Sequence, residues 1–208
     1  MSAEILEQFD VRQTFVRRGR NLEYLTIGWN SLEAVIAIAA GMFAGSIALV
    51  GFGVDSIIEV SSGAIILWRL FSGEHREKLA LKLVGISLVT LACYVGFDAV
   101  KSLILKEPPE ASYIGISLAA LSLVVMPLLA RAKRSVAAQL GSRAMMADSK
   151  QTDICAYLSA ILLVGLGLNA LFGWWWADPV AGLAMIPIIA KEGIDALKGK
   201  TCCGEACC

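Results

Sequence analysis

Long apolar stretches dominate the chain, and short polar segments separate them. Six of these stretches approach the roughly 20 residues that a helix needs to cross a bilayer, and they lie at residues 22–41, 54–71, 83–105, 113–130, 146–171 and 179–190. The pattern predicts an all-α membrane protein with six transmembrane helices. Residues 1–21 are expected to form an N-terminal segment, residues 22–197 the membrane domain and residues 198–208 a cysteine-rich tail.

Composition supports a membrane protein. Of the 208 residues, 57% are hydrophobic and 17% are charged, against about 25% charged in an average soluble domain. The polar residues 1–20 contain no apolar core of a signal peptide, so the first apolar stretch is expected to stay as a helix. Acidic and basic residues balance at 18 each, and the expected partner is the lipid bilayer, not nucleic acid.

Basic residues define the expected orientation. They gather in the N-terminal segment, in the second and fourth loops and after the last apolar stretch. Cytoplasmic loops of membrane proteins carry an excess of Lys and Arg. Both termini are therefore predicted to face the cytosol, in a multi-pass protein of the cell membrane.

Two carboxylates interrupt the second apolar stretch. Asp55 and Glu59 are four residues apart, so they lie on one helix face. An ionisable side chain at membrane depth is costly and indicates function, and two of them are tolerated when they share a proton or hold a cation. The alternative is a structural hydrogen-bonded pair within a helix bundle.

A third carboxylate is expected at the same depth on the fifth helix. Glu59 is ten residues from Arg69, and Asp153 is ten residues from Arg143. Both arginines are taken to mark cytosolic helix ends, which puts the two carboxylates about 15 Å inside. Transporters bind their substrates near this midplane depth.

The predicted metal site therefore consists of Asp55, Glu59 and Asp153, with Ser149 or water as a fourth ligand. Ser149 lies one turn before Asp153 on the same face, whereas Asp148 is about 140° around the helix and is a weaker candidate.

Other polar side chains leave alternatives open. Glu33 either pairs with a lysine or lines the pathway, and Asp98 either pairs with Lys101 or has a function. Cys93 and Cys155 are expected to be small buried residues of the apolar runs.

The last seven residues contain four cysteines. Cys202, Cys203, Cys207 and Cys208 would suit Zn²⁺, Cd²⁺ or Cu⁺ in a reducing compartment. They either load or sense metal, or they belong incidentally to a flexible tail.

Several motifs in order resemble the cation diffusion facilitator family of divalent-metal transporters. Gly-Ser-Ile-Ala-Leu-Val at residues 45–50, followed by Val-Asp-Ser-Ile-Ile-Glu at 54–59, is similar to that family's first loop and second helix. Phe-Asp-Ala at residues 97–99, Asp153 and Asp-Pro-Val-Ala-Gly at 178–182 are similar to its third, fifth and sixth helices.

The resemblance implies export of a divalent metal from the cytosol in exchange for protons. Zinc is expected, with manganese, iron, cobalt or cadmium as alternatives, and no permanent cofactor. Ser149 stands where the family usually has His, and the family's cytosolic C-terminal domain is expected to be missing, so a homodimer would form through membrane helices. The competing hypothesis is a membrane metal-binding or regulatory protein that does not transport. An enzyme is not expected, because no nucleophile–base pair or phosphate loop is present.

Overall fold

All regular structure in the described part of the chain is helical. The computed structural model describes residues 3–44, 47–72, 77–106 and 112–199. Six α-helices occupy these segments: α1 (Ala3–Ala44), α2 (Ile47–Ser72), α3 (Glu77–Leu105), α4 (Tyr113–Leu140), α5 (Arg143–Phe172) and α6 (Ala177–Leu197). Each predicted apolar stretch lies within one of these helices, which confirms the all-α prediction.

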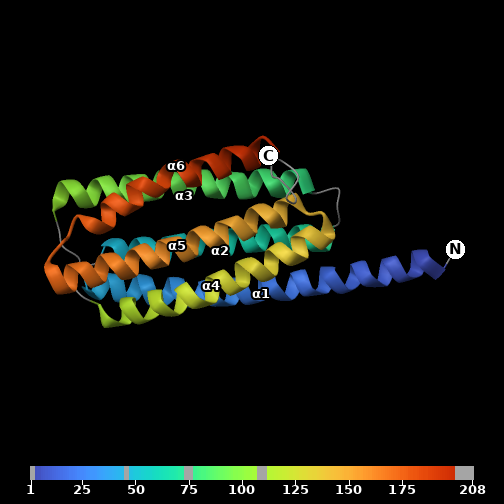
Figure 1. Ribbon diagram of the computed structural model, residues 1–208, viewed down its shortest axis with the longest axis horizontal. Helices are drawn as coiled ribbons and strands as arrows, with labels where there is room; N and C mark the ends of the chain where they lie inside the picture. The colour runs from blue at the N-terminus through green and yellow to red at the C-terminus, as the bar shows by residue number, and fades with distance from the viewer. Residues whose placement is uncertain (1–2, 45–46, 73–76, 107–111, 200–208) are drawn as a thin grey trace.

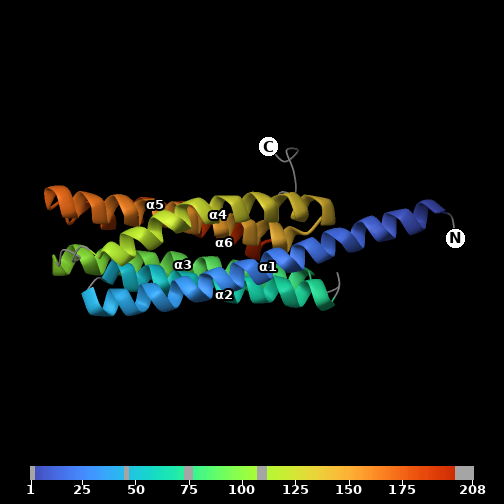
Figure 2. The ribbon, with the colours of Figure 1, turned by 90° about the horizontal axis from the view of Figure 1, so that it is seen from below.

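The helices run along a common direction and form an elongated bundle (Figure 1). α1 packs against α2 and α4, α3 packs against α6, and α5 contacts the four helices α2, α3, α4 and α6. In the turned view of Figure 2, α5 lies on one side of the bundle and α1 and α2 lie on the other. The meeting of α2 and α5 in the interior is what positions the site described below.

Four of the helices are long and apolar enough to cross a membrane: Val11–Phe43, Leu49–Ser72, Lys78–Leu105 and Tyr113–Leu140. The shortest has 24 residues, or about 36 Å at 1.5 Å per residue, which exceeds a hydrocarbon core of about 30 Å. Among the described residues, α5 and α6 do not meet this criterion. α5 carries charged side chains at Arg143, Asp148, Lys150 and Asp153, although its apolar run continues beside the other helices.

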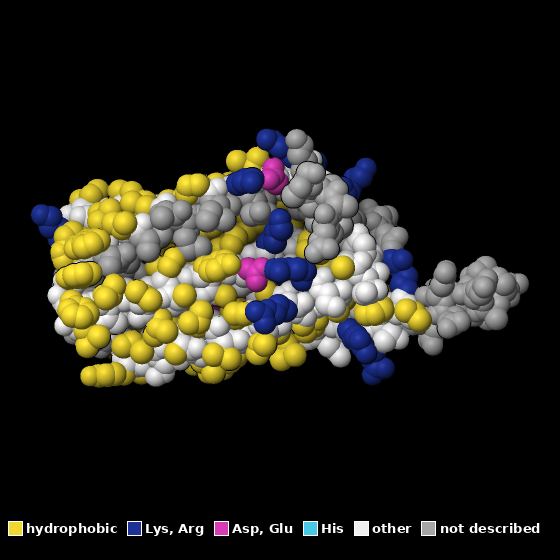
Figure 3. Space-filling model, viewed as in Figure 1, with side chains coloured by type: hydrophobic (Ala, Val, Ile, Leu, Met, Phe, Trp, Pro, Cys, Tyr) yellow, Lys and Arg dark blue, Asp and Glu magenta, His cyan; other side chains and the backbone are white. Residues whose placement is uncertain are grey.

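The two ends of the bundle differ in charge. The end of α2, the start of α3, the α4–α5 turn and the end of α6 lie at one end of the bundle, and α1 extends beyond that end (Figure 1); we call this the basic end. On the face shown in Figure 3, most Lys and Arg side chains lie in the half nearer this end, whereas hydrophobic side chains cover the other half. Large apolar side chains such as Val35, Phe43 and Ile104 are more than two-thirds exposed, as expected where lipid covers the surface.

A tight turn sets the register between α4 and α5. α4 ends at Gly141, whose φ of 61° is in the left-handed region that glycine adopts without strain. The backbone N–H of Ser142 donates to the carbonyl of Ala137 at 3.0 Å, and the Ser142 hydroxyl accepts from the N–H of Met145 at 3.1 Å. With only two residues between the helices, α5 returns directly alongside α4.

Close approach of α3 and α6 depends on two glycines. A Cβ at Gly85 would lie 2.9 Å from the backbone nitrogen of Leu197, and a Cβ at Gly193 would lie 2.9 Å from Val89 Cγ2. Small residues at such positions let membrane helices pack closely.

A polar layer interrupts the apolar core. One hydrophobic cluster includes Ile66, Leu88 and Met145, and a second cluster includes Phe52 and Met126. Among the described residues, the polar side chains that are less than 2% exposed include Glu23, Glu33, Glu59, Ser62, Lys133, Asp148, Gln151 and Thr152. Burial of so many polar groups is costly unless they are paired or bind something.

Candidate metal site between α2 and α5

The two carboxylates of α2 are both buried. Asp55 is 3% exposed and Glu59 is 1% exposed, and Ser62 continues the same polar stripe toward the basic end. Within the described part of the structure, three carboxylate oxygens lack a hydrogen-bond partner: both oxygens of Glu59 and the Oδ2 of Asp55. A buried carboxylate oxygen without a partner is expensive, so this pair is poorly explained as a structural hydrogen-bonded pair.

α5 presents a thiol and an amide to the interior. Cys155 lies near both Asp55 and Glu59, and Thr152 lies near Glu59, but neither forms a well-aligned hydrogen bond with the Glu59 oxygens or with Asp55 Oδ2. Gln151 lies four residues before Cys155, so the two side chains share a helix face. Gln151 is 1% exposed, and neither its Oε1 nor its Nε2 has a hydrogen-bond partner among the described residues.

Asp153 lies on a different face of α5 from these residues. Its side chain is 31% exposed and forms an ion pair with Arg134 of α4. At about 100° per residue, position 153 is roughly 140° around the helix from the buried position 148. The structure therefore does not bring Asp153 together with Asp55 and Glu59, contrary to the expectation from depth alone, because depth does not fix the helix face.

Ser149 does not join the carboxylates of α2 either. It is fully buried, and its hydroxyl donates to the carbonyl of Met146 at 2.7 Å. Position 149 is about 120° around α5 from Cys155. Its hydroxyl is thus engaged within its own helix.

Asp148 belongs to a buried ion cluster that joins four helices. Lys133 Nζ of α4 lies 2.5 Å from Asp148 Oδ2, 3.1 Å from Glu23 Oε2 of α1 and 3.4 Å from Thr152 Oγ1. The Ser62 hydroxyl of α2 donates to Asp148 Oδ1 at 2.6 Å. We call these five residues the Lys133 cluster. Because Lys133 already neutralises Asp148, this carboxylate is not available to a metal in this arrangement.

Glu33 approaches the polar layer from α1. It is fully buried, and one of its oxygens accepts a hydrogen bond of 2.9 Å from the Ser56 hydroxyl of α2. Its Oε1 has no hydrogen-bond partner in the described residues. Among the described residues Glu33 has no lysine partner, and its contact with Ser56 favours the alternative that it lies along the polar layer.

The neighbouring groups do not form a closed coordination sphere. Within the described segments, no three His, Cys, Asp or Glu side chains converge closely enough to hold one metal ion. Asp55 and Glu59 lie on one face of α2, and Cys155 of α5 lies near both of them.

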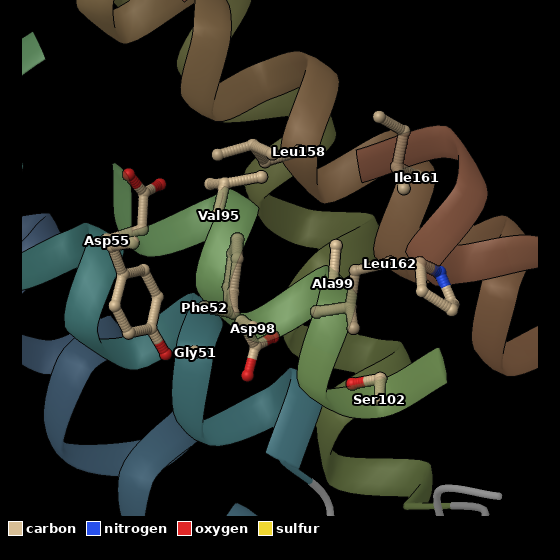
Figure 4. A pocket seen from close by; sticks show the side chains of 12 residues that line it. Gly51, Phe52, Asp55, Val95, Asp98, Ala99, Ser102, Leu158, Ile161 and Leu162 are labelled. Atoms are coloured by element: carbon tan, nitrogen blue, oxygen red, sulfur yellow. The ribbon is translucent and has the colours of Figure 1, made fainter. Parts of the chain in front are cut away.

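A small pocket adjoins Asp55 on the side away from the basic end. It has a volume of about 70 Å³ and is lined by residues of α2, α3, α5 and α6. Figure 4 shows Asp55 on α2 and Asp98 on α3 among the side chains that line it. On the opposite side of Glu59, the Lys133 cluster separates the carboxylates from the basic end.

The sequence analysis missed Cys155 and Gln151. Both are uncharged, so neither stands out in an apolar stretch as a buried charge does. A usable signal was present, because Gln151 and Cys155 repeat on α5 the four-residue spacing of Asp55 and Glu59 on α2. Cys155 is buried as expected, whereas Cys93 is exposed, which corrects the expectation that it is buried. The tail cysteines lie outside the described residues.

The fold and the buried groups define a helical membrane protein with ionisable groups between two antiparallel helices. The family model of the cation efflux transmembrane domain matches residues 24–200. The chain therefore belongs to the cation efflux family.

Relatives agree with this assignment. The uncharacterized transporter MJ0449 of Methanocaldococcus jannaschii is 32% identical over 183 residues, which cover 82% of this chain and 64% of the relative. Transmembrane protein 163 of Xenopus laevis is 25% identical over 89% of this chain and 68% of the relative. A cadmium, cobalt and zinc/H⁺–K⁺ antiporter of Bacillus velezensis is 25% identical over 62% of this chain and 41% of the relative. The chain thus spans about two thirds or less of the length of these relatives.

Proposed function

We propose that the chain carries a divalent metal ion across the membrane through a site formed by Asp55, Glu59 and Cys155, with the Gln151 amide oxygen as a fourth ligand. The observation that carries the proposal is the burial, within membrane-length helices, of carboxylate oxygens that lack hydrogen-bond partners and face a thiol of the antiparallel helix. The proposed site does not include Asp153 and Ser149, because they lie on other faces of α5 than Cys155. It does not include Asp148, because Lys133 neutralises that carboxylate.

The ligand set suits zinc and similar ions. Tetrahedral zinc accepts thiolate and carboxylate ligands, and a thiolate favours borderline and soft ions over purely oxygen-preferring ones such as manganese. Ser149 stands where the family usually has His, and the thiol of Cys155 would supply the softer ligand that the missing imidazole would have provided. Zinc, cadmium and cobalt are therefore the leading substrates, ahead of iron and manganese.

The proposed orientation in the membrane rests on the charge of the two ends. Lys and Arg gather at the basic end, which by the positive-inside rule lies in the cytosol. In the proposed topology all six helices cross the cell membrane, because α5 and α6 run beside the four apolar helices (Figures 1 and 2). Metal would enter from the basic end and leave through the pocket beside Asp55. A homodimer would form through the apolar outer faces of the helices.

Exchange for protons fits the same groups. Carboxylates and thiols must lose their protons to bind a metal, so metal binding releases protons. Protons that return to Asp55, Glu59 and Cys155 after the metal leaves would reset the site. The antiporter name of the Bacillus velezensis relative is consistent with such an exchange.

Zinc flux in proteoliposomes tests the proposal with a matched control. Glu59→Gln should abolish flux and Cys155→Ser should lower it at least about tenfold, the equivalent of one strong contact. Asp153→Asn removes a carboxylate at a similar depth from the outer face of α5 and should leave flux unchanged. Loss of flux in Asp153→Asn together with normal flux in Cys155→Ser would refute the site.

The same experiment separates the competing function. A membrane metal-binding protein that does not transport would bind zinc with the same dependence on Glu59 and Cys155, but the wild-type protein would show no flux.

A further inference from the structure

Four polar side chains line the pocket beside Asp55, and we call this space the outer pocket. They are Asp55 itself, Tyr94, Asp98 and Ser102, and the other lining residues are apolar apart from the backbone of Gly51. The volume of about 70 Å³ is enough for about two water molecules at liquid density. Figure 4 shows Asp55 at one edge of the group, Ser102 near the opposite edge and Asp98 between them.

A glycine brings α3 close to α2 at this point. A Cβ at Gly51 would lie 2.8 Å from the Tyr94 hydroxyl oxygen and 3.3 Å from Asp98 Oδ2. Both oxygens therefore pack directly against the backbone of α2, one turn from Asp55. Tyr94 and Asp98 are themselves one turn apart on α3, so the two helices present their oxygens to the same space.

The outer pocket has an unsatisfied buried ligand at its inner edge. Asp55 is 3% exposed, and its Oδ2 has no hydrogen-bond partner in the described part of the chain. Two carboxylates, two hydroxyls and room for water form an oxygen-only set, which suits a partly hydrated divalent cation. This set differs from the α2–α5 site, where a thiol is present.

A transported ion needs a way to leave strong ligands. Conduction requires binding that is firm enough for the ion to enter and weak enough, over several positions, for it to leave. We propose that the outer pocket is a second cation position, an inference that rests on the proposed function. There the departing metal keeps Asp55 but exchanges Glu59 and Cys155 for Asp98, the Tyr94 hydroxyl and water. Replacement of the thiolate by oxygen ligands weakens the hold on zinc and promotes release.

Asp98→Asn tests this assignment in the full chain. All variants carry Ser at the four tail cysteines, and zinc flux in proteoliposomes is measured together with equilibrium Zn²⁺ binding by competition with a fluorescent chelator. Asp98→Asn should lower saturating flux about tenfold, as for one charge-assisted contact, while Zn²⁺ affinity changes by no more than about twofold. Lys82→Gln is the control, because Lys82 is an exposed cation of the same helix and does not line the pocket; it should keep both flux and affinity.

Asp98→Glu keeps the negative charge and should restore most of the flux. Three results would overturn the proposal: flux in Asp98→Asn equal to that of the parent, loss of affinity together with flux, or an Asp98→Glu variant as slow as Asp98→Asn. The proposed function fails differently, through a parent without flux or a Glu59→Gln variant that transports normally.

Discussion

At position 155, a thiol lies among carboxylates in the middle of a membrane-length bundle. Cys155 would give the proposed site a ligand that prefers zinc, cadmium or cobalt, and Gln151 one turn away has an amide oxygen with no hydrogen-bond partner in the described residues. Asp55 and Glu59 could be predicted from the sequence because a charge in an apolar stretch is conspicuous. Cys155 and Gln151 could not be recognised in the same way, since uncharged side chains carry no such cost. The charge of Asp153 drew the prediction to a face of α5 that the structure places away from Asp55 and Glu59.

Gln151→His is a test at the scale of single residues. An imidazole at this position would lie on the face of Cys155 and add a nitrogen ligand that suits zinc. Zn²⁺ affinity should rise about tenfold relative to Mn²⁺, the effect of about one additional ligand contact. Ser149→His serves as the control, because position 149 lies about 120° away on α5 and should give no gain. Competitive binding of Zn²⁺ and Mn²⁺ measures this preference. A larger gain in relative Zn²⁺ affinity in Ser149→His than in Gln151→His would contradict the assignment.

At the scale of helices, the sequence predicted where the apolar segments lie but not how they face one another. The six stretches were found, yet α1 extends from residue 3 to residue 44 and α4 extends to residue 140, because polar residues continue a helix beyond the apolar core. The contact between Lys133 and Asp148 depends on the register that the α4–α5 turn imposes. No spacing in the sequence reveals a contact between side chains of α1, α2, α4 and α5, so the Lys133 cluster could only come from the structure.

Lys133→Met tests whether the Lys133 cluster holds the helices together. Its removal leaves Glu23 and Asp148 buried without their cation, which should lower the free energy of unfolding by about 3–5 kcal/mol. Thermal unfolding in detergent measures this loss. Arg131→Met removes an exposed cation of the same helix and should cost no more than about 0.5 kcal/mol.

A second substitution makes the Lys133 test specific. Asp148→Asn in the Lys133→Met protein removes one of the unpaired charges and should recover part of the stability. Equal stability of Lys133→Met and Arg131→Met would show that the cluster does not support the bundle.

At the scale of the whole molecule, the two sides of the α2–α5 site are unlike. The Lys133 cluster lies between Glu59 and the basic end, whereas the outer pocket adjoins Asp55 on the other side. In the described arrangement an ion cluster lies on one side of Glu59 and a small pocket lies beside Asp55 on the other. Alternating access would require the Lys133 cluster to open as the outer pocket closes.

Coupling to protons is a property of the whole cycle. Because the carboxylates and the thiol must be deprotonated to bind metal, zinc affinity should fall as the pH is lowered. An acidic compartment at the outer end should then accelerate zinc release and drive export. Proteoliposomes with an imposed pH gradient and a pH-sensitive dye should show zinc flux in one direction and proton flux in the other. Zinc flux that ignores the gradient, without proton counterflow, would indicate uniport.

The central claim is that the metal binds between α2 and α5 with Cys155 as a ligand. X-ray absorption at the zinc edge tests this most directly, on protein in which the four tail cysteines are replaced by Ser. We predict one sulfur ligand at about 2.3 Å with oxygen ligands at about 2.0–2.2 Å, and Cys155→Ser should remove the sulfur contribution and leave oxygen ligands alone. A spectrum without sulfur in the parent protein, or a sulfur contribution that persists in Cys155→Ser, would contradict the claim.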